Sequence, residues 1–340
     1  MVFPHATGLL ILAVALAPVA AHSQSATPGT VLEEVTVTAS RSPAEQRLDA
    51  AAGGTAIVTS RDLPATTNLT LSRALAGVPG VVVQDFFGAN DQPRVQIRGS
   101  GLQQNPVERG VLMLRNGLPL NRADGSYVVG FADPGAAGAV EVYRGYMANR
   151  LGATVLGGAL NLISPTGHDA PGVELGAGGG SFGQRDLSVR YGHERARFDT
   201  LLHGDFNDRE GYRAYNASRR ASIGGNVGTR VSDTLTVRFF ASFADLAFDV
   251  AGPLTRDALE RNPRSVFTGP TVTPMGAINP GPNVVRDRPY REASQLQAGA
   301  RATQTFGAHI VDLAVGHART DDHFNFPVSA GLRVTEGDDT

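Results

Sequence analysis

The sequence predicts a small mixed α/β domain followed by antiparallel transmembrane β-barrel strands that make up an incomplete barrel. Up to about Pro165, short apolar runs alternate with turn residues, as in a small mixed domain. After Pro165 the apolar residues recur at every second position. Each of these later runs is about ten residues long, which is the length that a tilted strand needs to cross a bilayer.

The composition of this 340-residue chain narrows the classes of function. The chain has no cysteine, which excludes a disulfide scaffold, a thiolate nucleophile and a cysteine metal cage. Its net charge of -2 provides no basic field for nucleic acid. The glycine-rich run Gly178–Gly183 fits a dinucleotide-binding pattern by letter, but an alternating strand follows it, so we interpret it as a hairpin turn. We find no nucleophile, base and acid set, and we expect neither enzyme activity, nor a metal, nor a cofactor.

The N-terminus predicts a secretory signal over residues 1–21. An apolar run from Gly8 to Ala17 is followed by small residues, and cleavage is expected between Ala21 and Ser23. The alternative, an N-terminal membrane anchor, needs a longer apolar core.

Residues 22–45 are expected to be a flexible linker that contains one β-prone run. The run consists of Glu34, Val35, Thr36 and Val37. It is either an ordinary first strand or an edge strand that is offered to a partner, because an extended peptide can add to a sheet edge through main-chain hydrogen bonds. We favour the edge strand that is offered to a partner.

Residues 46–166 are predicted to form the small mixed domain. Leu71 and Leu75 have helical spacing, with Thr70 as a candidate cap and Pro79-Gly80 as the end of the helix. The apolar runs expected to form the sheet of this domain are Val81–Val83, Val95–Ile97, Val111–Leu114 and Val140–Val142.

The stretch from Val140 to Ile163 is the most informative part of the chain. Two β-type runs flank a glycine-rich segment, which by itself predicts only a tight strand-turn-strand unit. The stretch resembles the end of the plug domain of TonB-dependent outer-membrane receptors, in which Glu-x-x-Arg-Gly precedes Tyr-Gly and Gly-Gly-x-x-Asn-Ile. The matching positions are Glu141, Arg144, Gly145, Gly152, Gly157, Gly158 and Asn161, whereas Leu151 replaces the usual Tyr.

Two further signatures of the same family precede this stretch in the expected order. Gln96-Ile97-Arg98-Gly99 matches an Ile-Arg-Gly turn, and Leu112–Leu120 contains Asn116-Gly117 where the family usually has Asp-Gly. Asn tolerates the same turn geometry, so the predicted turn is unchanged.

Residues 172–340 are predicted to form about eight strands of the N-terminal part of the barrel. Leu187, Val189 and Tyr191 alternate with polar residues, and later runs show the same period. Short connections at 192–196, 228–233 and 306–308 alternate with longer ones at 207–218, 249–291 and 321–328. Short turns on one side of the membrane and long loops on the other are typical of outer-membrane barrels. A soluble β-sandwich shares the period of two, but it has no reason to alternate its loops, so we prefer the barrel.

The resemblance implies active uptake in the bacterial outer membrane without chemistry on the substrate. The run from Glu34 to Val37 is similar to the TonB box and would bind TonB, while Arg98 and Arg144 would pair with carboxylates on the inner barrel wall and latch the plug. The residues after Pro165 are too few for the roughly 22 strands of plugged transporters. We therefore expect the N-terminal portion of a receptor, with the wall strands that supply those carboxylates missing.

The implied ligand is a scarce small molecule, with a ferric siderophore as the first expectation and cobalamin, a saccharide or another metal chelate as alternatives. A secreted or periplasmic β-rich binding protein that shares the plug is the competing class. Arg122 and Tyr127 would suit an anionic or aromatic chelate, through the guanidinium and the ring. The ligand-binding candidates on plug loops that face outward are Asn90, Gln103, Gln104, Asn105, Arg122, Asp124 and Tyr127.

Overall fold

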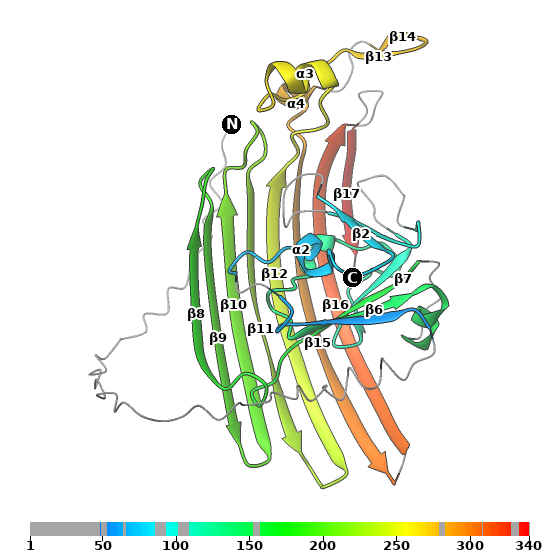
Figure 1. Ribbon diagram of the computed structural model, residues 1–340, viewed down its shortest axis with the longest axis vertical. Helices are drawn as coiled ribbons and strands as arrows, with labels where there is room; N and C mark the ends of the chain where they lie inside the picture. The colour runs from blue at the N-terminus through cyan, green and yellow to red at the C-terminus, as the bar shows by residue number, and fades with distance from the viewer. Residues whose placement is uncertain are drawn as a thin grey trace, which may run out of the picture. The chain divides into compact units, whose positions relative to one another are not determined.

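The computed structural model describes a small domain and a large sheet (Figure 1). The small domain comprises the described residues from Gly53 to Pro165, and the large sheet begins at Gly172. The predicted signal, the run Glu34–Val37, and the ligand candidates Asn90, Gln103, Gln104 and Asn105 lie outside the described residues. The residues that the structure describes are 48, 53–63, 66–85, 93–100, 109–151, 157–278, 283–307, 309–327 and 333–339.

The main sheet of the small domain has five strands. In sheet order they are β1 (Thr55–Thr59), β6 (Ala139–Arg144), β7 (Gly158–Ile163), β4 (Val111–Arg115) and β5 (Leu118–Pro119). β4 and β7 run parallel, whereas the other neighbouring pairs are antiparallel. β4 and β7 are buried along nearly their whole length, as expected for apolar strands that are covered on both faces.

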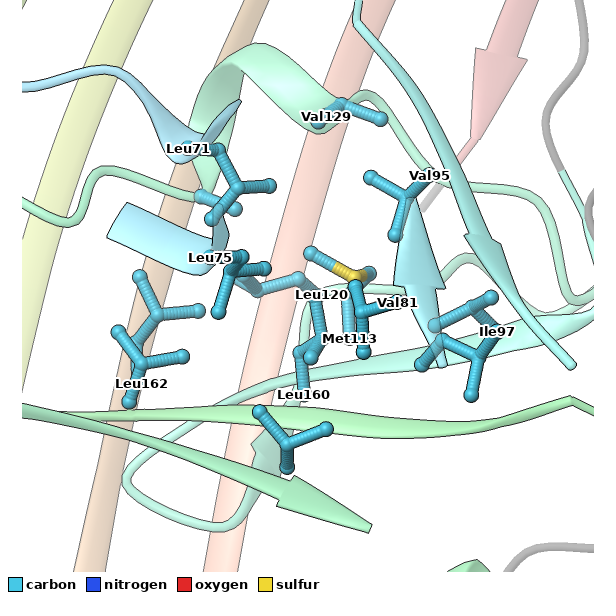
Figure 2. Packing of buried hydrophobic residues seen from close by; sticks show 14 of the residues in the cluster. Leu71, Leu75, Val81, Val95, Ile97, Met113, Leu120, Val129, Leu160 and Leu162 are labelled. Carbon is cyan, nitrogen blue, oxygen red and sulfur yellow. The ribbon is translucent and has the colours of Figure 1, made fainter. Parts of the chain in front are cut away.

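A second, two-stranded sheet and a short helix complete the core of the small domain. β2 (Val81–Gln84) pairs with β3 (Arg94–Ile97), so the prediction that these runs belong to one sheet with the others is wrong. The reason is that the two sheets face a shared core from different sides, and Figure 2 shows side chains of both sheets in one apolar cluster. The predicted helix exists as α2 (Leu71–Leu75), with the Thr70 side chain accepting from the Arg73 N–H at 3.2 Å, but it ends at Leu75 and not at Pro79.

The motif residues of β6 and β7 form a buried polar network. Glu141 and Asn161 are register partners, and the Asn161 amide donates to the Glu141 carboxylate at 2.8 Å. The Asn161 side-chain oxygen accepts from the Gly117 N–H at 2.9 Å, which ties the strand pair to the β4–β5 turn. Asn116 and Gly117 have φ values of 54° and 77°, so the predicted tight turn is confirmed.

The large sheet has eight strands in the described residues, and all neighbouring pairs are antiparallel (Figure 1). In sheet order they are β17 (Arg333–Asp339), β16 (His309–Pro327), β15 (Tyr290–Phe306), β12 (Leu235–Asp249), β11 (Ser218–Arg230), β10 (Phe198–Arg209), β9 (Arg185–Arg195) and β8 (Gly172–Gly179). The predicted fold class, a small mixed domain followed by antiparallel strands, is therefore confirmed.

Several strands are longer than the sequence predicts. The predicted loop at 321–328 lies largely within β16, and the predicted connection at 192–196 begins within β9. The extra residues of β9 are polar or glycine, so they do not extend the apolar alternation, whereas those of β16 include Phe324 and Phe326. Both sets pair with their neighbours in the sheet. A turn-like composition at the end of a strand therefore does not mark where pairing stops.

The two faces of the large sheet differ in chemistry. On the outer face, which contains the register partners Val227 and Phe239, large apolar side chains are exposed, for example Leu175 at 71% and Leu313 at 66%. The inner face, which contains the register partners Gly228 and Arg238, has mainly polar and charged residues. The inner-face side chains used below are Arg220, Ser242, Gln295, Gln297, Arg301 and Asp322.

The connections are short at one end of the large sheet and long at the other (Figure 1). The connection between β12 and β15 contains α3 (Arg256–Arg261), β13 (Thr271–Thr273), β14 (Gly276–Ile278) and α4 (Val284–Asp287).

The small domain also has the 3-10 helices η1 (Val129–Phe131) and η2 (Gly145–Leu151). Among the described helices, none has both the length and the apolar character needed to span a membrane.

Candidate functional site at the interface of the small domain and the large sheet

A buried ion pair joins the small domain to the inner face of the large sheet. Asp133, which closely follows η1, accepts from the Arg220 guanidinium of β11 at 2.6 Å, and their side chains are only 6% and 8% exposed. Arg220 also donates to the Asn207 side chain of β10 at 3.2 Å. Because removing one partner leaves an uncompensated buried charge, this pair couples the two parts of the chain strongly.

Arg115 of β4 reaches the same region of the large sheet, whose strands are called the wall below. Its guanidinium donates to the Ser242 hydroxyl of β12 at 2.6 Å and to the Phe131 carbonyl at 2.7 Å. Burial lowers the pKa of Arg115 to about 10; the Asp133 charge opposes this shift and the Arg220 charge adds to it. The side chain is therefore still a cation at neutral pH.

A second ion-pair network lies nearer to the long connections. The Asp322 carboxylate of β16 accepts two hydrogen bonds from Arg291 of β15, at 2.8 and 2.6 Å, and it also pairs with Arg122 of the small domain. Asp322 is 1% exposed and Arg291 is 2% exposed. One buried carboxylate between two guanidiniums fixes the 121–127 turn against the large sheet.

An apolar cluster supports these polar contacts. Val128 and Phe131 of the small domain pack with Ala244, Leu246 and Phe248, which lie on the inner face of β12. These wall residues are apolar exceptions on a polar face, because the small domain covers them.

The structure places Arg144 entirely within the small domain. Its guanidinium donates to the carbonyls of Gly54, Thr55 and Pro79 at 3.2, 2.9 and 2.6 Å. These bonds tie the end of β6 to β1 and to the turn that precedes β2. Arg98 lies in an exposed turn with φ of 52°, and its guanidinium lies beside Gly54 and Gly145. The pairing of Arg98 and Arg144 with barrel carboxylates stays a prediction.

Three predicted ligand residues lie in the described chain, and they have different environments. Arg122 is held by Asp322, as described above. Asp124 pairs with Arg109 and accepts from the Ser126 N–H and hydroxyl at 2.9 and 2.6 Å. Burial raises the pKa of Asp124, but the hydrogen bonds from Ser126 and Arg109 outweigh it and bring the pKa to about 2.

Tyr127 differs from the expectation. Its ring is 1% exposed and belongs to the apolar core of the small domain, so it offers no surface to a ligand in this structure. The 121–127 turn brings it inward, because the Asn121 side chain bonds the backbone of Met113 and Val111 and closes the turn onto β4. The sequence places Tyr127 beside polar loop residues, and this position alone does not indicate that its side chain points into the core.

The long-connection end of the large sheet holds a cavity of about 270 Å³ across β10, β11, β12 and β15. Its lining carries charges of both signs, which suits a polar or ionic group better than an apolar one. The charged lining residues are Asp208, Arg209, Arg219, Asp249, Arg291 and Glu292. Within the described residues there is no cluster of three or more His, Cys, Asp or Glu that could hold a metal ion.

Three of the long-end connections meet in an aromatic and cationic cluster. The rings of Phe182 and Tyr212 meet edge to face at 5.2 Å, and the Arg264 guanidinium lies 5.9 and 5.8 Å from their centres. The Arg264 side chain also donates to the Tyr212 carbonyl at 3.1 Å. The cluster joins the β8–β9, β10–β11 and β12–β15 connections.

The residues that hold the small domain to the large sheet were not among the predicted contacts. They are Asp133 of the small domain and Arg220, Arg291 and Asp322 of the large sheet. A usable signal exists, because Arg220, Arg291 and Asp322 fall on the inner face by the period of two. The choice of partner on the small domain has no such signal.

Comparison with known proteins identifies the small domain. The family model described as the TonB-dependent Receptor Plug Domain matches residues 47–159. A curated relative, the vitamin B12 transporter BtuB of Vibrio vulnificus (strain CMCP6), is 28% identical over 181 residues. That match covers 53% of this chain and 28% of the transporter, so the chain spans well under half of its relative's length.

Solved structures share the fold of both parts. The unliganded ferric citrate transporter FecA matches with a TM-score of 0.61 at 16% identity, covering 81% of this chain and 41% of the transporter. The ferric yersiniabactin uptake receptor FyuA of Yersinia pestis matches with a TM-score of 0.60 at 13% identity, covering 81% and 42%. At these identities the likeness concerns the fold.

Proposed function

The chain carries the plug domain of the TonB-dependent receptors and shares their fold, and on that premise we propose that it serves the active uptake of a scarce ligand across the bacterial outer membrane. The observation that carries the proposal is the large sheet with two unlike faces. Its outer face exposes apolar side chains such as Leu175 and Leu313, whereas its inner face holds a small domain through buried charges. An apolar outer band around a polar interior suits hydrocarbon outside and protein or water inside.

In this proposal the small domain is a stopper and the chain does no chemistry on the ligand. The run from Glu34 to Val37 binds TonB by adding a strand to it, and force on that run displaces the small domain. In the same proposal Arg98 and Arg144 pair with carboxylates on the inner barrel wall and latch the small domain. The domain division at 1–21, 22–45, 46–166 and 172–340 belongs to the same proposal.

For the ligand we propose a ferric siderophore. The solved neighbours named above are ferric citrate and ferric yersiniabactin proteins by description. Cobalamin is the second candidate, because the curated relative is described as a vitamin B12 transporter. The proposed contacts are Asn90, Gln103, Gln104, Asn105, Arg122 and Asp124, with Arg122 and Asp124 in the turn that meets the wall near the long connections.

Cell fractionation tests the location. The full chain, expressed with its signal in a Gram-negative host, is expected in the outer-membrane fraction, extractable only by detergent. Recovery of folded chain from the periplasm would instead support the soluble binding protein that shares the plug.

A binding assay tests the ligand class. Chain folded in detergent is titrated with a radioactive ferric siderophore and, separately, with labelled cobalamin. A Gln103→Ala, Gln104→Ala double variant is expected to weaken binding of the true ligand by about 30-fold, since each lost hydrogen bond costs about 1 kcal/mol. A Gln304→Ala variant, on a strand far along the chain, is the matched control and should bind normally.

A deletion tests the coupling role. Removing residues 33–38 is expected to abolish uptake in a host that depends on this gene, while ligand binding at the cell surface is kept. Removing residues 25–30 shortens the same linker by the same length and should leave uptake intact. Unchanged uptake after the first deletion would exclude the coupling role.

A further inference from the structure

One strand of the wall contacts the β4–β5 hairpin (residues 116–120) at successive inner-face positions. On β15, Gln295 donates to the Leu120 carbonyl at 3.3 Å and Gln297 to the Pro119 carbonyl at 3.0 Å. Arg301 of the same strand donates to the Asn116 carbonyl at 2.8 Å. The two glutamines are only 4% and 5% exposed, so their side chains are buried against the hairpin. All three acceptors are main-chain carbonyls, which any hairpin sequence would present.

The position between these donors is a glycine, and it receives the Leu118 side chain. A Cβ on Gly299 would lie 2.3 Å from Leu118 Cδ1, closer than atoms can approach. Gly299 pairs in register with Gly316 of β16, where a Cβ would lie 2.9 Å from Leu118 Cδ2. The two glycines therefore form a notch across two strands, and Leu118, which is 7% exposed, fills it.

We propose that the inner face of β15 is a docking strip that seats the small domain, with Leu118, Gly299 and Gly316 as positioning residues. Donors to main-chain carbonyls hold the hairpin but do not select its register, because every residue offers a carbonyl. The leucine in the notch selects the register, since neighbouring inner-face positions such as Gln297 and Arg301 carry large side chains. The strip holds β5, which is one edge of the main sheet, and leaves the opposite edge, β1, outside the contact.

Thiol labelling tests whether the hairpin is seated on the strip. The chain has no cysteine, so Leu118→Cys introduces a single thiol. In the full chain folded in detergent, a water-soluble maleimide should react at least about 30-fold more slowly than in urea, because the site is buried. Adding Gln297→Ala and Arg301→Ala should speed labelling about tenfold, because two hydrogen bonds are lost. Adding Gln304→Ala, on the same strand but off the strip, should change nothing. Fast labelling of the first variant, or no response to the strip substitutions, would overturn the proposal.

A double substitution tests the notch itself. Leu118→Ala and Gly299→Ala should each speed hydrogen exchange of the Leu120 amide, which donates to the Met113 carbonyl, by about 30-fold or more. The double variant should exchange about tenfold more slowly than either single variant, because the added methyl group occupies room left by the leucine. Gly204→Ala is the control, since a Cβ there would lie 3.4 Å from Val189 and has room. If the exchange rate of the double variant rises by the product of the two single increases, the leucine and the glycine do not act as a pair.

Discussion

The two main sheets of this chain use the same apolar residue types in opposite ways. In the small domain Val140, Met113 and Leu160 are fully buried, with 0% exposed. In the large sheet Leu175 and Leu313 are 71% and 66% exposed. A soluble domain hides such residues from water, whereas a sheet that turns them outward requires an apolar surrounding. Residue type alone therefore does not say which face is the interior; the pairing of the two parts does.

The largest expected effect tests whether the inner face is a protein interior or a wet lumen. Asp322→Ala leaves the buried Arg291 and the half-buried Arg122 without their carboxylate and should lower the free energy of unfolding by about 3–5 kcal/mol. Urea titration in detergent measures it. Asp321→Ala, whose side chain is 44% exposed beside Arg319, is the matched control and should cost less than about 1 kcal/mol. Equal small losses would mean that the inner face is solvated.

The same leucine truncation in the two sheets tests the comparison directly. Leu160→Ala removes a fully buried side chain and should cost about 2–5 kcal/mol. Leu313→Ala removes an exposed one and should cost less than about 1 kcal/mol. Both are measured by urea unfolding in the same detergent. A large loss at Leu313 would show that the outer face is packed against protein.

A charge on the outer face tests the proposed membrane contact. Phe239→Arg places a guanidinium in the apolar band, where Phe239 is 56% exposed, and should cost about 2–4 kcal/mol in lipid vesicles. Thr234→Arg, in a short turn at the end of the sheet, should be neutral. Comparable stability of both variants in lipid would contradict the bilayer assignment.

The smallest expected effect concerns acid. The pKa of Asp124 in the folded chain is about 2, below the ordinary value of 3.8 for this carboxyl group, so its contribution to stability is complete above about pH 4 and is lost as the pH falls toward about 2. Because its pair with Arg109 is nearly half exposed, the loss should stay below about 1 kcal/mol. Urea titrations at several pH values measure it, and Asp124→Asn should flatten this part of the profile. A profile that keeps its slope in that variant would assign the acid sensitivity to another carboxyl.

Local features of the fold were predictable because each depends on a few neighbouring residues. Thr70 caps α2, and Asn116-Gly117 turns between β4 and β5, since both need only a side-chain oxygen or a left-handed backbone at one place. The candidate site was less predictable. Tyr127 lies next to polar loop residues but is buried, and the Arg144 guanidinium donates hydrogen bonds to carbonyls of its own domain.

The sequence by itself determined the fold class, the two faces of the large sheet and the turns, because the pleat of a strand and the geometry of a turn are local. Only the tertiary structure decided which groups meet across the interface. Arg122 and Asp322 are 200 residues apart in the chain, and Leu118 meets a notch made by two glycines on different strands. Such contacts depend on how one folded part docks on another. The hydrophobic periodicity of the sequence reflects only local structure, so it does not predict that docking.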